Sequence, residues 1–177
     1  MIRIIAIVVL FFLQCQADLP PVMKDLDENK VLGAWNGISA ASSCKQFLQM
    51  KSDNMPSPVN IYSLSNGHMK SSTSFQTDKG CQQMDVDMTT VEKGHYKWNM
   101  PQGESETIIV ATDYEVFLME FTKSHMGAED CVTVKLFGRE GTLPEDRIQH
   151  FKDHIKKVGL NEEQYIRFHT KATCVPK

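Results

Sequence analysis

Short stretches in which apolar and polar side chains alternate fill most of the chain between residues 32 and 139. Alternation with a period of two is typical of strands that turn one face to a core, and these stretches are rich in β-branched and aromatic residues. Turns containing glycine, proline or asparagine separate them at close intervals. The pattern predicts eight strands, at residues 34–41, 59–65, 68–76, 82–90, 94–100, 106–111, 115–123 and 131–138. Such spacing favours an antiparallel meander, either a sandwich or a barrel, and a closed barrel of eight strands can hold one small ligand.

The period of the pattern changes after residue 140. Apolar residues now recur at helical spacing, at Ile148, Phe151, Ile155 and Val158. Thr142-Leu143-Pro144-Glu145 has the form of a capping box, with Thr142 at the cap and Pro144 inside the first turn, and Gly159 ends the segment. We expect one amphipathic helix of about 15 residues, packed on the sheet. A last short strand is expected from Tyr165 to His169, and no repeat or linker divides residues 18–177, which we interpret as a single domain.

The beginning of the chain has the features of a secretory signal peptide. Arg3 precedes ten apolar residues, from Ile4 to Leu13, and small residues follow up to Ala17. A retained membrane anchor is the alternative, but a spanning helix needs about 20 apolar residues, and no later segment is long enough either. Residues 1–17 are therefore predicted to be removed, leaving a secreted, extracellular protein without stable membrane insertion.

The charge of the chain argues against two kinds of partner. The chain has 19 Lys and Arg against 22 Asp and Glu, and removal of Arg3 with the leader gives a net charge of −4. No basic cluster is present, so neither nucleic acid nor an anionic membrane surface is an expected partner.

Four cysteines follow the leader: Cys44, Cys81, Cys131 and Cys174. An even number in a secreted chain implies two disulfides, with three possible pairings. A metal site is not expected, because the chain has no Cys-x-x-Cys motif with a nearby histidine pair. His150 and His154 have a spacing that can bind zinc, but without a third ligand they more often form a solvated helix face. No cofactor is implied.

Three short motifs in order resemble those of the lipocalin family: Gly33-x-Trp35 in the first strand, Thr112-Asp113-Tyr114 in the turn after the sixth, and Arg139 at the end of the eighth. The resemblance covers residues 29–174. Within the family, the phrase "FLMEF…VKLFGRE" and the positions of Cys81 and Cys174 are most similar to the secreted group of tear lipocalin, late-lactation proteins and odorant- and pheromone-binding proteins. It implies an all-β protein, an eight-stranded antiparallel up-and-down β-barrel with one C-terminal α-helix on its wall.

The resemblance also assigns structural roles. The residues with structural roles are Gly33, Trp35, Thr112, Asp113, Tyr114 and Arg139. Trp35 would plug one end of the barrel, with the Arg139 guanidinium on its ring face, a contact worth about 0.5–2 kcal/mol. The resemblance to the lipocalin family also pairs Cys81 with Cys174. Cys44 and Cys131 are left, and because the first and eighth strands of a lipocalin are neighbours, we expect a second disulfide between them near the open mouth.

Alternation along the strands then yields a candidate ligand-binding set. Placing Tyr114 and Arg139 inward sets the phase of the last two long strands, including Thr122 and Thr133. The set is Val59, Tyr62, Leu64, Met69, Val86, Met88, Trp98, Met100, Ile109, Val116, Leu118, Glu120, Lys135 and Phe137. Glu120 would face Lys135 inside the barrel, where Lys135 could meet a carboxylate or hydroxyl of a ligand. If the phase is off by one residue, the two instead form a surface ion pair.

These expectations lead to a secreted carrier for a small hydrophobic or amphipathic ligand, such as a fatty acid, retinoid, steroid or odorant-like molecule. The alternative is an extracellular protein-interaction role, as a protease inhibitor, immune-modulating protein or milk protein, residing in the loops at residues 43–58 and 123–130. An enzyme is not expected, because no nucleophile and base are paired. The cysteine that a lipocalin-type prostaglandin synthase carries on its second strand is absent from "VNIYSLSN". A monomer or weak homodimer, with a possible cell-surface receptor, completes the prediction.

Overall fold

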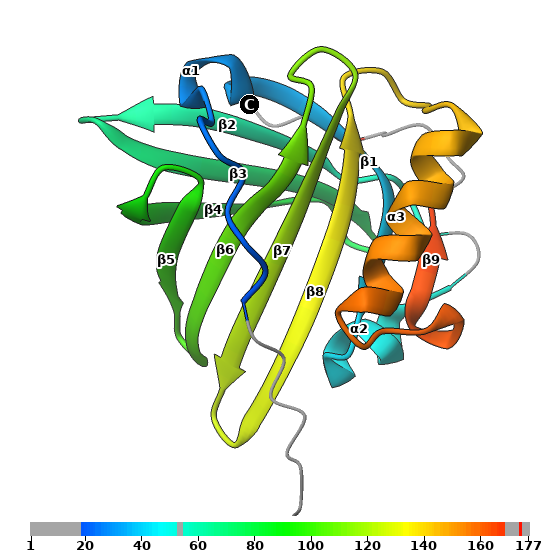
Figure 1. Ribbon diagram of the computed structural model, residues 1–177. Helices are drawn as coiled ribbons and strands as arrows, with labels where there is room; N and C mark the ends of the chain where they lie inside the picture. Colours follow the sequence, from blue (N-terminus) through cyan, green and yellow to red (C-terminus); the bar gives the residue numbers. More distant parts are fainter. Residues whose placement is uncertain (1–18, 53–54, 169–173, 175–177) are drawn as a thin grey trace, which may run out of the picture.

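The computed structural model describes residues 19–52, 55–168 and 174, and its main element is one continuous antiparallel sheet. The long strands are β1 (Gly33–Ser42), β2 (Val59–Ser65), β3 (His68–Thr77), β4 (Gly80–Glu92), β5 (His95–Met100), β6 (Gly103–Thr112), β7 (Phe117–Met126) and β8 (Glu129–Gly138). Each pairs with the next along the chain, and β1 pairs with both β2 and β8 (Figure 1). The sheet therefore closes into the predicted eight-stranded barrel.

Three helical turns and a ninth strand complete the described fold. Two short helices that the sequence did not predict, α1 (Glu28–Val31) and α2 (Lys45–Met50), lie at opposite ends of the barrel (Figure 1). The 3-10 helix η1 (Glu162–Gln164) leads into β9 (Tyr165–Arg167), which pairs with the middle of β1. The predicted last strand is thus present but shorter, and the expected end at His169 lies outside the described residues, as does the predicted signal peptide.

The wall helix is α3 (Glu145–Lys157), and the predicted capping box is wrong. Pro144, not Thr142, is the N-cap residue, with extended backbone angles and no side-chain cap. Its carbonyl accepts the first helical hydrogen bonds, from the backbone N–H groups of Arg147 and Ile148. Because the backbone becomes helical only after Pro144, Thr142 lies too far upstream to cap the helix.

An outer core joins α3 to the barrel wall. Ile148, Phe151 and Ile155 of the helix are completely buried. They pack in one cluster with outward side chains of β1, β7 and β8, namely Ile38, Ala41, Phe117, Met119, Phe121, Val132, Val134 and Leu136. The odd-numbered residues of β7 therefore face the helix, which leaves its even-numbered residues for the interior.

One end of the barrel, at the top of Figure 1, is covered by α1 and the β6–β7 turn. Trp35 is fully buried there, and its Nε1 donates a hydrogen bond to the Val31 carbonyl of α1 at 2.7 Å. The Arg139 guanidinium lies 3.7 Å from the centre of the indole ring. Gly33 has φ of +96°, and a Cβ there would come within 3.3 Å of the guanidinium. We call this the closed end, and the opposite end of the barrel the open end.

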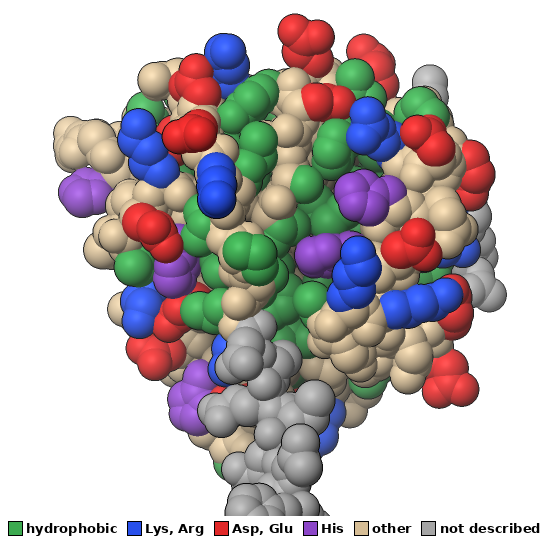
Figure 2. Space-filling view, in the orientation of Figure 1, with side chains coloured by type: hydrophobic (Ala, Val, Ile, Leu, Met, Phe, Trp, Pro, Cys, Tyr) green, Lys and Arg blue, Asp and Glu red, His purple; other side chains and the backbone are tan. Residues whose placement is uncertain are grey.

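Both predicted disulfides are confirmed. Cys44 bonds to Cys131, linking the segment after β1 to β8, and Cys81 bonds to Cys174, linking β4 to the C-terminal segment. No helix among the described residues is long and apolar enough to span a membrane. On the face drawn in Figure 2, acidic and basic side chains are interspersed rather than gathered by sign.

Candidate ligand-binding interior

Next to the closed end, the barrel holds an inner apolar core. Its strand residues, which come from all eight long strands, are Trp35, Tyr62, Met69, Val86, Met88, Tyr96, Ile109, Leu118 and Phe137. Leu26 and Val31, from the segment that crosses the end, join them. Because these side chains are buried, they form an apolar floor to the interior.

A polar group lies next to this floor, centred on Glu120 of β7. Glu120 and Lys135 occupy paired positions of β7 and β8, and Lys135 Nζ lies 3.0 Å from Glu120 Oε1. Thr122 donates to the same oxygen at 3.3 Å, and the Tyr62 hydroxyl of β2 donates to Oε2. The two charged side chains therefore point into the barrel, and the surface-pair interpretation is excluded.

Hydroxyl groups continue this polar zone away from the floor. Thr107 and Thr122 lie 3.0 Å apart, oxygen to oxygen, and the Trp98 indole donates to Thr107 at 2.9 Å. Ser42 and Thr133 are paired in the same way at 2.8 Å, beside the Cys44–Cys131 disulfide. The interior thus changes from apolar at the closed end to polar toward the other end.

Solvent reaches this polar zone. Lys135 points inward, yet its side chain is 37% exposed, whereas that of Glu120 is only 5% exposed. Trp98, Met100 and Thr133, on the same inward face, are also partly exposed. Trp35 and its neighbours are buried at the closed end, whereas these partly exposed inward residues lie farther toward the open end.

The electrostatics of the zone keep its phenol groups protonated. Burial raises the pKa of Tyr62 well above its ordinary value, and the adjacent Glu120 raises it further. Burial and the hydrogen bond to Glu28 likewise raise the pKa of Tyr96, near the closed end. Both hydroxyls are therefore hydrogen-bond donors at neutral pH, and the Tyr62 hydroxyl donates its hydrogen bond to Glu120.

Most of the residues predicted to bind ligand come together in this interior, but three do not. Val59 is buried outside the barrel, because Asn60 is the residue that pairs with inward Trp35, and Val59 pairs with Asn36. Leu64, near the end of β2, is 44% exposed beyond the floor. Val116 is 42% exposed in the turn before β7, which begins two residues later than predicted. These three are corrections to the predicted set.

Several inward residues were missed. Asn60 is buried and its Oδ1 accepts hydrogen bonds from Ser71 and Thr73 at 2.7 and 2.8 Å. Counting in twos from Tyr62 would have found Asn60, and counting from Trp98 would have found Tyr96. The small polar residues of β3 gave no such signal, because a serine-rich strand shows no contrast between its faces.

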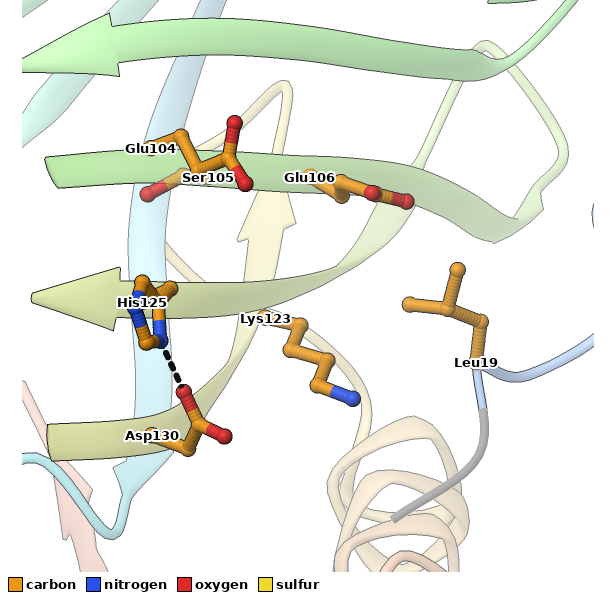
Figure 3. A pocket seen from close by; sticks show the side chains of 7 residues that line it. All are labelled: Leu19, Glu104, Ser105, Glu106, Lys123, His125 and Asp130. Atoms are coloured by element: carbon orange, nitrogen blue, oxygen red, sulfur yellow. Dashed lines mark hydrogen bonds and ion pairs between the residues drawn. The ribbon is translucent and has the colours of Figure 1, made fainter. Parts of the chain in front are cut away.

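A second pocket, on the outer wall, has a different character (Figure 3). It measures about 230 Å³ and is lined by Leu19, Glu104, Ser105, Glu106, Lys123, His125 and Asp130. Three of its charged lining residues form ion pairs: His125 contacts Asp130, while Lys97 lies 2.8 Å and His95 3.0 Å from Glu106. The Lys97 contact, more than the His95 contact, lowers the pKa of Glu106. Six of the seven residues that line this pocket are polar or charged, in contrast to the apolar barrel floor.

No metal centre accompanies either pocket within residues 19–52, 55–168 and 174, where no three His, Cys, Asp or Glu side chains are grouped to hold an ion. The paired histidines of α3, His150 and His154, have no such third partner there.

A closed eight-stranded barrel with a wall helix and a graded interior defines a class of small-molecule-binding barrels. The chain belongs to the lipocalin family: residues 32–172 match the model of the lipocalin / cytosolic fatty-acid binding protein family. It is 85% identical over 177 residues, all of both chains, to "Olfactory protein" of Lithobates pipiens. It is 25% identical over 158 residues to "Lipocalin" of Rhinella marina, covering 88% and 86% of the two chains.

Among solved structures, the chain is similar to "The Siderocalin Ex-FABP functions through dual ligand specificities", with a TM-score of 0.72. The sequences are 17% identical, and the match covers 84% of this chain and 95% of the other. At this identity the likeness supports the fold alone. Members of the family are generally binding or carrier proteins, and its characteristic barrel suits small hydrophobic ligands.

Proposed function

We propose that this protein is a secreted carrier, which binds a small hydrophobic or amphipathic molecule inside the barrel and takes it up through the open end. The ligand's apolar part would lie on the floor around Leu118 and Phe137, where burial of apolar surface supplies about 25 cal/mol per Å². Its polar part would face Lys135 and the hydroxyl groups. No bond is made or broken in this proposal, which assigns the protein no enzymatic activity.

The observation that carries the proposal is the unequal exposure of the inward ion pair. An ammonium group inside a barrel packed solid with side chains would be as buried as its carboxylate partner. Lys135 is instead 37% exposed and Glu120 5% exposed. Space that water can reach beside an apolar floor is what a carrier needs.

The comparisons favour the same proposal. The relative that is 85% identical is named an olfactory protein. For this chain we therefore rank volatile, odorant-like molecules first among ligands, before fatty acids, retinoids and steroids. Two disulfides are typical of proteins in an oxidising environment, which supports secretion.

The test is the displacement of a fluorescent hydrophobic probe, 1-aminoanthracene, with native mass spectrometry of the purified protein to reveal a retained ligand. Leu118→Lys places a charge on the floor and is expected to reduce probe affinity at least tenfold. Val116→Lys makes the same exchange two residues away, on an exposed side chain, and is expected to leave affinity unchanged.

Leu118→Lys also risks unfolding the barrel, so Thr133→Phe is a second variant. It fills the inward, partly exposed position beside the open end and is expected to weaken probe binding without disturbing the floor. If neither the probe nor any ketone, alcohol, fatty acid, retinoid or steroid binds the folded protein, the carrier function is refuted. Equal effects of Leu118→Lys and Val116→Lys would refute the barrel interior as the site.

A further inference from the structure

The interior contains a charged lysine whose charge is already balanced. From the floor up to the Cys44–Cys131 disulfide, the inward positions of the described strands carry only two charged side chains, Glu120 and Lys135. They form one ion pair at 3.0 Å, so these inward strand positions contribute no net charge.

The two partners differ in what they offer a ligand. Glu120 is nearly inaccessible, and both its oxygens are occupied, by Lys135 and Thr122 on one side and by Tyr62 on the other. Lys135 has three N–H donors, of which the described residues occupy one, and it is the exposed member. A ligand therefore meets hydrogen-bond donors of Lys135 but not an uncompensated positive charge.

This arrangement disfavours ions of either sign. A ligand carboxylate bonded to Lys135 would lie close to Glu120, and two anions sharing one cation repel each other strongly where solvent is limited. A ligand ammonium would meet Lys135 itself, since Glu120 is shielded. A neutral carbonyl or hydroxyl oxygen accepts a charge-assisted hydrogen bond from Lys135 and leaves the ion pair intact.

We propose that Glu120, held by Tyr62 and Thr122, makes this interior selective for neutral ligands with a carbonyl or hydroxyl acceptor, and that it excludes carboxylates. This inference rests on the carrier function proposed above and replaces the expectation that Lys135 meets a carboxylate. The neighbouring hydroxyl pairs, Thr107 with Thr122 and Ser42 with Thr133, match such a ligand because they are neutral and can donate or accept.

The experiment compares three ligands of similar chain length, 2-undecanone, decanoate and decylammonium, by isothermal titration calorimetry at pH 7.5. The natural sequence is expected to bind the ketone at least tenfold more tightly than decanoate or decylammonium. In Glu120→Gln, the amide keeps the size of the side chain and its acceptor, but the charge of Lys135 is no longer balanced. Decanoate affinity is expected to rise at least tenfold, while ketone affinity changes less than threefold.

Glu106→Gln is the matched control, because it removes the same charge from another glutamate paired with a lysine, on the outer wall. Its ratio of ketone to decanoate affinity is expected to equal that of the natural sequence. Lys135→Met is a further variant, should Glu120→Gln fail to fold; it is expected to weaken ketone binding about tenfold and to leave decanoate excluded.

Three results would overturn the inference while the carrier function stands. They are decanoate binding as tightly as the ketone to the natural sequence, equal shifts in Glu120→Gln and Glu106→Gln, and undiminished ketone binding in Lys135→Met. If no ligand of any kind binds, the carrier function fails and the selectivity falls with it. The two failures are therefore told apart by whether anything binds.

Discussion

The side chain of Arg139 links several parts of the closed end through hydrogen bonds that the sequence motifs did not predict. Its guanidinium lies on the Trp35 ring and donates hydrogen bonds to backbone carbonyls of two separate segments, residues 30–34 and the β6–β7 turn. The accepting residues, at 2.8–3.1 Å, are Lys30, Leu32, Ala34 and Tyr114. A planar group with five donors in a fixed geometry can make these contacts together, whereas a lysine ammonium cannot.

Arg139→Lys is therefore expected to lower the free energy of unfolding by about 2–3 kcal/mol, because the stacking and most of the charge-assisted hydrogen bonds are lost. Urea unfolding followed by tryptophan fluorescence measures it. Arg167→Lys is the control: among the described residues, the Arg167 side chain forms an ion pair with exposed Glu145 alone, at 3.2 Å, and the expected loss is below about 1 kcal/mol. Equal losses in the two variants would contradict the central position of Arg139.

At the scale of elements, the helix α3 combines a buried apolar face with one buried polar atom, Nε2 of His154. The helix buries Ile148, Phe151 and Ile155 against the wall, which stabilises its docking. His154 lies at the edge of this face, and its Nε2 is buried without a hydrogen-bond partner among the described residues. Burial, more than the neighbouring His150 and Lys157, lowers the pKa of His154.

His154→Leu is expected to stabilise the protein by about 1 kcal/mol, since an unsatisfied buried polar atom is replaced by an apolar group. The gain should grow below about pH 6.5, the ordinary histidine pKa. There the unfolded chain binds a proton that the folded chain refuses, so the natural sequence loses stability as pH falls. Urea unfolding at pH 7.5 and pH 5.0 measures both effects.

His150→Leu, one turn earlier on the same helix, is the control, because the His150 side chain is exposed. It is expected to retain most of the acid dependence. If His154→Leu loses stability between pH 7.5 and pH 5.0 as steeply as the natural sequence, His154 is not the group responsible.

At the scale of the whole molecule, the two disulfides connect segments that are far apart in sequence. Cys44 and Cys131 are separated by 87 residues, and Cys81 and Cys174 by 93. The first disulfide ties the segment leading into α2 to β8. It lies beside the interior hydroxyl groups, because Cys44 Sγ contacts the Thr133 hydroxyl. The second ties the C-terminal segment to β4, on the outside.

Replacing either pair by alanine is expected to lower the free energy of unfolding by about 4 kcal/mol, from the loop entropy regained by the unfolded chain. The stability losses should be similar because the loops are of similar length. Only Cys44→Ala with Cys131→Ala should also weaken probe binding, since only that disulfide borders the open end. Calorimetric unfolding and probe displacement on both variants test this, and equal binding losses would contradict it.

Much of the fold could be predicted from local pattern. Alternation located all eight strands within a few residues, because each strand has one face on a core. Spaced motifs, more than alternation, distinguished a barrel from a sandwich. The failures lie where local pattern is weak. Val59 was assigned out of phase with Tyr62 on the same strand, Leu64 lies near the end of β2, Val116 lies in the turn before β7, and α1 and α2 are too short to show a helical period.

The sequence by itself determined the strands and the cysteine inventory, because each follows from residues close together in the chain. Only the tertiary structure decided between the two phases of β7 and β8, by placing Glu120 and Lys135 inside the barrel. Only the tertiary structure decided that Tyr62 of β2 reaches Glu120 of β7, since those strands are not neighbours and meet only inside a closed barrel. It also decided that Lys135 is the exposed member of the ion pair. Accessibility depends on everything packed around a side chain, and no stretch of sequence contains that information.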